Sequence, residues 1–318
     1  MNVEFIISRN CQGERLDQVV ALHVPDCSRS CAAHMVKTGR ILVSQVRKKP
    51  GYRVKEGEII TGEFAPEPER LPLQAQPLAI EILYDDAHIA VLNKQAGMVV
   101  HPGAGNVSGT LVNALLYHFP QLKRIKDEPL RAGIVHRLDK ETSGVMVVAK
   151  TDAAVAFLQQ EFKQRMVAKQ YLALVAGSVQ DSCGRVELPI GRHPVKRKMM
   201  STSSASPRPA VTLWQVRKRF SRTTFLGVEL KTGRTHQIRV HFKALGHPLV
   251  GDRVYGSRHQ IKHPETRRHM LHAWKLSFRH PWSKELLAFK APLPEDFRQQ
   301  LHKRHQESRC QVRRPFEP

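Results

Sequence analysis

The sequence contains no apolar run that approaches the roughly 20 residues needed to cross a bilayer, so we expect no membrane-spanning helix. Residues 1–9 alternate in polarity without a basic start and an apolar core, so we also expect no signal peptide. The five cysteines are an odd number, and none forms a C-x-x-C pair. Neither a disulfide framework nor a cysteine zinc site is therefore expected, and the thiols should be reduced in a cytoplasmic protein.

Sequence motifs for nucleotide cofactors and metals are also missing. No G-x-x-x-x-G-K-[ST] is present, and the run Gly103–Gly109 has one residue too many before its last glycine to match a dinucleotide fingerprint. His236 and His241 are five residues apart, one more than in the i, i+4 pair that holds zinc on a helix. We therefore expect neither a cofactor nor a metal ion.

Acidic side chains are scarce: 28 Asp and Glu stand against 51 Lys and Arg, which gives a net charge of +23. The excess is uneven. Residues 1–66 carry 10 basic and 7 acidic side chains, residues 67–191 carry 13 of each, and residues 192–318 carry 28 basic and 8 acidic ones. This balance favours a polyanionic partner, namely RNA, DNA or an anionic membrane surface. Its concentration in one segment favours a duplex-sized polyanion bound over one side of the chain.

Prolines indicate a domain boundary, because four of them between residues 65 and 78 exclude a helix or a central strand there. We predict a small α+β module over 12–66, a linker over 67–78, a larger domain over 79–300 and a basic flexible tail over 301–318. The larger domain lacks regular strand–helix alternation. We therefore expect a mixed, mainly antiparallel sheet with flanking helices instead of a doubly wound parallel sheet.

Local patterns predict individual elements. Ser28 should cap a helix that ends near Gly39, and a strand should follow over 40–46. Apolar spacing predicts helices over 152–166, with Asp152 as the cap, and over 235–245. Further strands are predicted over 89–92, 145–149, 171–176, 211–216 and 225–230.

One carboxylate lies among cationic neighbours. Asp139 follows His136 and Arg137 and precedes Lys140, in a segment with a glycine at each end. Opposite charges keep such a carboxylate ionised, and an ionised aspartate in a cleft acts as a nucleophile or a base. A salt-bridged loop aspartate, or a cap on the next element, is the alternative that the residues alone leave open.

Two other segments can contribute to the same chemistry. Residues 230–241 place Arg234 and Arg239 around a predicted helix start, where the N-terminus adds partial positive charge. A solvated basic face is the alternative there. Tyr171 lies on an otherwise apolar strand, where it is either a core residue or a surface on which a base stacks.

Taken together, these segments resemble the RluA-type pseudouridine synthases. The resemblance rests first on His136-Arg137-Leu138-Asp139, followed by Lys140 and Thr142-Ser143-Gly144. Two more stretches match in the right order, namely Asn93-Lys94 with Val100-His101-Pro102-Gly103, and Thr232–Arg239 with Gly246-His247-Pro248, Gly251-Asp252 and Tyr255-Gly256. The first module resembles an S4 RNA-binding domain, so the resemblance spans roughly residues 12–298. Residues 100–106 and 190–197 resemble a D-type subgroup that acts on large-subunit ribosomal RNA.

The resemblance implies an isomerase that converts uridine to pseudouridine after flipping the nucleotide out of the RNA. Asp139 would start cleavage of the glycosidic bond, Arg239 would pair with Asp139, and Tyr171 would stack on the base and serve as the general base. Arg137 would fill the gap in the duplex. The residues expected to bind RNA are Arg137, His136, Lys140, Arg234, Arg29, Lys37, Arg192, Lys196 and Arg197.

The implied substrate is 23S ribosomal RNA, with target uridines in helix 69, either as free RNA or in a pre-50S particle. We expect a cytoplasmic monomer that does not bind membranes. The alternatives are a tRNA-directed synthase and a non-catalytic rRNA-binding or ribosome-assembly factor. DNA binding is not favoured, because the sequence has no recognisable helix that would read a DNA groove. Two segments depart from the family pattern. Gln95 stands where proline is usual, and Val43-Ser44-Gln45 replaces Val-Asn-Gly.

Overall fold

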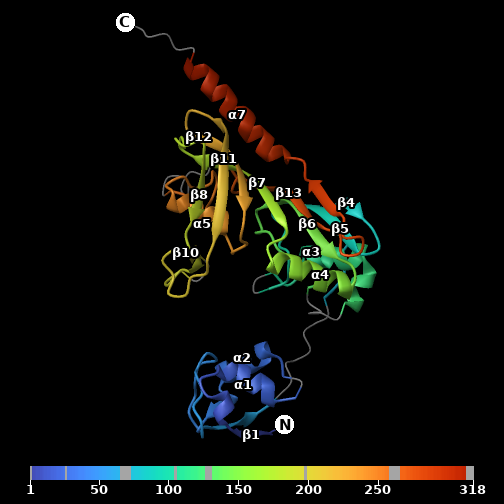
Figure 1. The fold of residues 1–318 in the computed structure, drawn as a ribbon, viewed down its shortest axis with the longest axis vertical. Helices are drawn as coiled ribbons and strands as arrows, with labels where there is room; N and C mark the ends of the chain where they lie inside the picture. The colour runs from blue at the N-terminus through green and yellow to red at the C-terminus, as the bar shows by residue number, and fades with distance from the viewer. Residues whose placement is uncertain are drawn as a thin grey trace. The chain divides into compact units, whose positions relative to one another are not determined.

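The computed structural model describes residues 2–25, 27–64, 73–103, 106–125, 131–196, 199–257 and 266–312. The chain divides into two compact units, residues 1–72 and 73–318 (Figure 1). Of the predicted linker 67–78, residues 67–72 lie outside the described part. Residues 73–78 correct that prediction, because they pack on the second unit: Asn113 Nδ2 donates to the Gln74 carbonyl at 2.7 Å, and the Gln76 amide donates to the Asn113 carbonyl at 2.9 Å.

The first unit is a small α+β module. Its elements are β1 (Asn2–Ile6), a 3-10 turn η1 (Arg9–Cys11), α1 (Leu16–His23), α2 (Arg29–Thr38), β2 (Ile41–Val43) and β3 (Ile59–Glu63). The strands form an antiparallel sheet in the order β1-β3-β2. The Ser28 hydroxyl accepts a hydrogen bond from the Cys31 amide at 3.2 Å, and Gly39 ends α2 with φ 79°, so both predicted helix ends are confirmed.

The strand predicted over 40–46 is shorter, because β2 ends at Val43. Ser44 and Gln45 both adopt left-handed backbone conformations, with φ 45° and 65°. This is the turn for which an Asn-Gly pair is the usual choice. Two hydrogen bonds hold it here: the Ser44 amide donates to the Ile59 carbonyl at 2.7 Å, and the Ile59 amide donates to the Ser44 hydroxyl at 3.3 Å.

The second unit is built on one large sheet. Its elements are β4 (Glu81–Asp85), β5 (Ile89–Lys94), α3 (Leu111–His118), η2 (Pro120–Arg124), β6 (Ser143–Ala149), α4 (Asp152–Lys163), β7 (Ala168–Ala176), β8 (Cys183–Glu187), β9 (Gly191–Arg192), β10 (Met200–Ser201), β11 (Val211–Arg219), β12 (Thr223–Leu230), α5 (Gln237–Ala244), β13 (Leu271–Arg279), β14 (Leu286–Lys290) and α7 (Glu295–Val312). The sheet order is β4-β5-β6-β13-β7-β12-β11-β8, with β14 also paired to β13. Of these pairings the β6–β13 pair alone is parallel, which confirms the mixed, mainly antiparallel class.

Helices cover the two halves of this sheet separately. α3 and α4 lie together beside β6, while α5 lies beside β11 and β8 (Figure 1). β6 is buried along its whole length in the first core, which α3 and α4 complete. Ile238 and Phe242 of α5 pack into the second core, with β7, β11 and β12. The two cores adjoin at β7 and β13, and the loop before β6 reaches this junction.

Three predicted boundaries need correction. Thr151 caps α4, because its hydroxyl accepts from the Ala154 amide at 3.2 Å, and Asp152 is the first helical residue. α4 ends at Lys163 instead of residue 166. α5 begins at Gln237 instead of residue 235, because the preceding His236 is left-handed with φ 57°.

The expected flexible tail is instead helical as far as residue 312, since α7 runs from Glu295 to Val312. Phe297 is fully buried and Leu301 packs against the same cluster, which anchors the helix to the sheet. The Ser221 amide also donates to the Ser308 hydroxyl at 3.2 Å. Residues 313–318 lie outside the described part. None of the helices in the described ranges is long and apolar enough to traverse a membrane.

Candidate active site

A cavity of about 450 Å³ lies where the loop before β6, strand β7 and the start of α5 meet. The structure brings together in its lining the three residues to which the family resemblance assigns catalysis, Asp139, Tyr171 and Arg239. The volume falls in the range of pockets that hold small molecules. The Asp139 side chain is 17% exposed, so it is reachable from the cavity and still largely shielded from bulk water.

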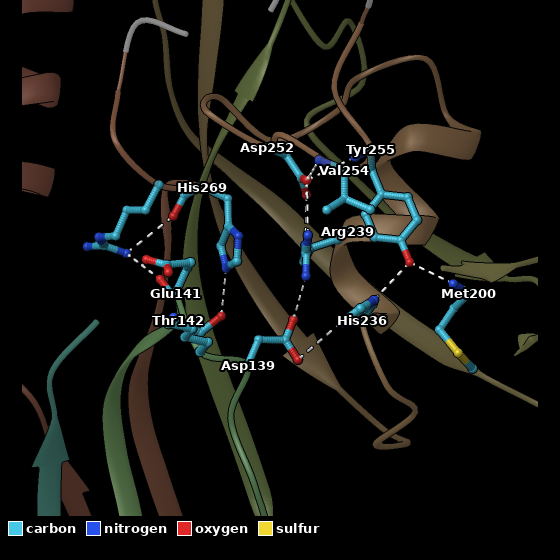
Figure 2. Close-up of polar contacts among 12 residues, drawn as sticks. Asp139, Glu141, Thr142, Met200, His236, Arg239, Asp252, Val254, Tyr255 and His269 are labelled. Carbon is cyan, nitrogen blue, oxygen red and sulfur yellow. Dashed lines mark hydrogen bonds and ion pairs between the residues drawn. The ribbon is translucent and has the colours of Figure 1, made fainter. Parts of the chain in front are cut away.

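Arg239 joins two carboxylates from distant parts of the chain (Figure 2). Its Nη1 donates to Asp139 Oδ2 at 3.0 Å, across 100 residues of sequence. Its Nε and Nη2 donate to Asp252 Oδ2 and Oδ1 at 2.8 and 3.0 Å, which is a bidentate pair. Asp252 is 1% exposed, and its Oδ1 also accepts from the amides of Val254 and Tyr255, both at 2.9 Å. The guanidinium is therefore held rigidly and presents one remaining face to Asp139.

The charges of this group are fixed by their pairing. Burial by itself would lower the pKa of Arg239, but the hydrogen bonds and charges of Asp252 and Asp139 outweigh it and raise that pKa above its ordinary value. Burial would likewise raise the pKa of Asp252, but its bond to Arg239 lowers it overall. Arg239 is therefore always charged and Asp252 ionised near neutral pH, so the charge that Arg239 presents to Asp139 does not vary with pH there.

The loop that carries Asp139 is held by its own backbone carbonyls. The Asp139 carbonyl accepts from the Thr142 amide at 3.0 Å, the Lys140 carbonyl from Lys94 Nζ at 3.1 Å, and the Glu141 carbonyl from Arg268 Nη1 at 3.1 Å. The Thr142 hydroxyl also contacts His269 Nε2 at 2.8 Å (Figure 2). The carbonyl groups of three successive residues, 139 to 141, are thus held by hydrogen bonds. These bonds fix the backbone that orients the Asp139 side chain.

Lys94 is a buried ammonium, 2% exposed, that holds two loops at once. Besides Lys140, it donates to the carbonyls of Gln95 and Met98 at 2.8 and 2.9 Å. Burial lowers the pKa of Lys94 to about 8. These bonds fix the turn in which glutamine replaces the usual proline, so the turn at Gln95 does not depend on a proline ring.

Tyr171 and His136 line the cavity as neutral rings. Burial, with a smaller contribution from the Asp139 charge, raises the pKa of the Tyr171 phenol, which is therefore protonated at neutral pH. Burial lowers the pKa of His136 to about 3. His136 Nε2 accepts from the Val147 amide at 3.0 Å, and its ring stacks on Phe162 at 4.7 Å. His136, which the resemblance places among the RNA-binding residues, is thus a neutral ring in the cavity wall.

The other residues expected to bind RNA lie in several places. Arg137 and Arg234 line the cavity; Arg137 is exposed, and Arg234 Nε donates to the Pro209 carbonyl at 3.1 Å. Lys140 is exposed but is not among the lining residues. Arg192 lies on β9 and Lys196 in the turn after it, both exposed. Arg197 lies outside the described residues.

Arg29 and Lys37 belong to the first unit. Both are exposed on α2, and Arg29 Nε lies 3.5 Å from Asp17 Oδ2. The two residues therefore belong to a different unit from the cavity. All the residues that line the cavity come from the second unit.

Sequence reasoning missed residues that act behind the cavity wall. Asp252, Tyr255 and Lys94 stand in the motifs quoted above, but nothing in their spacing says that they contact the Asp139 loop or Arg239. Arg268 and His269 belong to no motif and stand in a polar stretch just before β13, so no sequence signal distinguishes them from exposed residues, although both are buried. In the described ranges no group of three or more His, Cys, Asp or Glu side chains is arranged to hold a metal ion.

Comparisons with known proteins agree with this arrangement. Two family models match the chain: RNA pseudouridylate synthase over residues 88–244 and S4 domain over residues 14–60. The ribosomal large subunit pseudouridine synthase D of Neisseria meningitidis serogroup A is 44% identical over 89% of this chain and 77% of its own length. The protein of that name from Nitrosomonas europaea is 41% identical, over 92% and 85%.

A solved structure has the same fold. Human RNA Pseudouridylate Synthase Domain Containing 1 is 30% identical, with a TM-score of 0.57, over 72% of this chain and 86% of its own. Together with the two family models and the relatives above 40% identity, this similarity confirms what the motifs predict: the chain belongs to the RNA pseudouridine synthases and carries an S4 domain.

Proposed function

We propose that this chain isomerises uridines of large-subunit ribosomal RNA, with Asp139 as the reactive side chain. The observation that carries the proposal is the ion pair between Asp139 and the buried Arg239 in the wall of a cavity that Tyr171 also lines. An ionised, oriented carboxylate next to an aromatic ring suits a flipped-out pyrimidine nucleoside.

The reaction exchanges one bond for another within the nucleotide. The C–N glycosidic bond breaks, the uracil turns within the cavity, and its C5 bonds to C1′ of the ribose. C5 loses a proton and N1 gains one, so the reaction is an isomerisation with no net change in protons. Asp139 starts the cleavage, and Arg239 orients its carboxylate through the bond to Oδ2. Neither a redox equivalent nor phosphate energy is consumed.

Other cavity residues offset the free energy of flipping the nucleotide out of the RNA, which is a few kcal/mol. Exposed Arg137 at the cavity can enter the space that the nucleotide leaves in the stack. Tyr171 can stack on the base, which recovers about 1–3 kcal/mol. Its raised pKa keeps the phenol neutral, which favours this stacking role over that of a general base for the C5 proton.

The choice of ribosomal RNA rests on three observations. The relatives compared above are named for the ribosomal large subunit, the chain has an S4 domain, and residues 192–318 carry 28 basic against 8 acidic side chains. We place the target uridines in helix 69, and the enzyme in the cytoplasm as a monomer. A basic surface of this kind binds RNA through phosphate neutralisation, so affinity should fall steeply with salt.

The test compares Asp139→Asn with wild-type protein on large-subunit RNA transcripts. This substitution keeps the size of the side chain but removes its charge, so pseudouridine formation should fall by at least about 10³-fold. RNA affinity should stay within about threefold, because Asp139 contributes no positive charge to phosphate binding. Asp181→Asn, at an exposed aspartate before β8, is the matched control and should keep wild-type turnover. Undiminished turnover by Asp139→Asn would overturn the assignment.

A further inference from the structure

A second side chain approaches the carboxylate oxygen of Asp139 that Arg239 does not bond. His236 Nε2 lies 3.9 Å from Asp139 Oδ1, while Oδ2 accepts from Arg239 (Figure 2). At 3.9 Å the contact is not yet a hydrogen bond, and closing it to an ordinary length needs a displacement of about 1 Å. The two carboxylate oxygens therefore have different environments.

The other ring nitrogen of His236 is held by a buried phenol. His236 Nδ1 lies 2.8 Å from the Tyr255 hydroxyl, and the Met200 amide donates to the same oxygen at 2.7 Å. Tyr255 is 1% exposed, so its own hydroxyl hydrogen must find an acceptor. Among the described residues, His236 Nδ1 is the acceptor within hydrogen-bonding distance. Nδ1 therefore accepts, and in the neutral ring the hydrogen sits on Nε2 and faces Asp139.

The electrostatic surroundings keep this ring neutral. Burial is the main reason that the pKa of His236 lies below its ordinary value; the Asp139 charge opposes this, and the Arg239 charge supports it. Asp252 and Arg137 also act on the ring, with opposite signs. A neutral donor can orient the carboxylate without adding a second positive charge, which would make Asp139 a weaker nucleophile or base.

We propose that His236, fixed as its Nε2–H tautomer by Tyr255, is a positioning residue that holds Asp139 Oδ1 in its reactive orientation. This inference rests on the proposed function and adds a second, uncharged contact to the one that Arg239 makes. Nothing in it requires His236 to touch the RNA.

A purely structural role for His236 makes a different prediction. His236 has φ 57° and stands immediately before α5, a position where asparagine is one of the few well-tolerated side chains. If the backbone conformation were its only contribution, asparagine should replace it fully, and glutamine should replace it less well.

The experiment uses His236→Asn and His236→Gln in the full-length protein. The Gln amide nitrogen is as many bonds from Cα as His Nε2, so it can donate to Asp139. The Asn amide reaches only as far as His Nδ1 and can contact Tyr255 alone. We expect His236→Gln to keep kcat within about fivefold of wild type and His236→Asn to lose about 10–100-fold, with KM for the RNA transcript changed less than about threefold in both.

One outcome would overturn the inference, namely a kcat for His236→Asn equal to or above that of His236→Gln. Thermal unfolding of each variant identifies a folding defect, which the asparagine variant should avoid. Asp139→Asn, measured in parallel, separates the two claims: if it is inactive while His236→Asn turns over normally, the proposed function stands and the role of His236 falls.

Discussion

At the scale of single residues, the site depends on buried polar groups whose charge states are set by their neighbours. Arg239 is 6% exposed and would be costly to bury without partners, but Asp252 alone offers it two hydrogen bonds and a full charge. Buried histidines without such a charged partner are instead neutral, because burial disfavours the protonated ring. His269 and His272 are buried, and burial lowers their pKa values to about 3 and about 4.

These two histidines should make the folded state sensitive to mild acid. An unfolded histidine binds a proton below about pH 6.5, whereas the folded ones stay neutral, so stability is complete above that pH and falls as the pH drops towards 4. At pH 5 the loss is about 2 kcal/mol for each histidine relative to pH 7.5. Urea unfolding at both pH values measures it.

The matched variants are His272→Gln and His302→Gln. His272 Nε2 donates to the Ala291 carbonyl at 3.2 Å and Nδ1 accepts from the Ser143 hydroxyl at 2.9 Å, whereas His302 is exposed on α7. His272→Gln should reduce the pH 7.5-to-5 difference by about 2 kcal/mol, because glutamine does not titrate. His302→Gln should leave it unchanged. An unchanged difference in His272→Gln would mean that His272 is protonated in the folded protein.

At the scale of elements, α7 is tied to the loop that carries Asp139. Arg268 donates to both carboxylate oxygens of Asp296 in the first turn of α7, at 2.6 and 3.0 Å. The same guanidinium donates to the carbonyl of Glu141, two residues after Asp139. A change at the start of α7 should therefore reach the Asp139 loop through Arg268.

We predict that Asp296→Asn lowers both stability and turnover. The buried Arg268 loses its charged partner, which costs about 1–3 kcal/mol in the free energy of unfolding, and the Glu141 peptide becomes less well held. Glu295→Gln is the control, because its pair with Arg298 is exposed and contributes at most about 1 kcal/mol. Urea unfolding and initial rates measure the two effects. Equal behaviour of the two variants would show that α7 does not support the loop.

The elements also show how far sequence reasoning reached. Ser28 and Gly39 were sufficient to place the ends of α2, because capping is a local interaction. α7 was missed because its residues are mostly polar, and its apolar anchors Phe297 and Leu301 become visible only against the cluster they join. β13 was missed for a related reason: its partners β6 and β7 are more than 90 residues away in sequence.

Part of the candidate site was likewise predictable from the sequence and part was not. Asp139 and Arg239 were predicted as a pair through family resemblance, and the structure places them 3.0 Å apart. The partners of that pair could not be derived, because the left-handed turn at His236 and the buried contacts of Asp252 arise only when distant segments pack.

At the scale of the whole molecule, the chain combines an S4 domain with a catalytic unit whose C-terminal part is strongly basic. In the proposed function the basic side chains of residues 192–318 bind RNA phosphates, and the cavity around Asp139 holds the reacting nucleotide. We propose ribosomal RNA as the substrate, and the cell's own RNA offers ribosomal and transfer RNA to the enzyme at once.

The most direct measurement is chemical mapping of pseudouridine in total RNA from cells that lack this chain, complemented with wild-type protein or with Asp139→Asn. The account predicts that specific pseudouridines of large-subunit ribosomal RNA disappear without the protein, return with the wild type and stay absent with the variant. Restoration by Asp139→Asn, or a loss confined to transfer RNA, would contradict it.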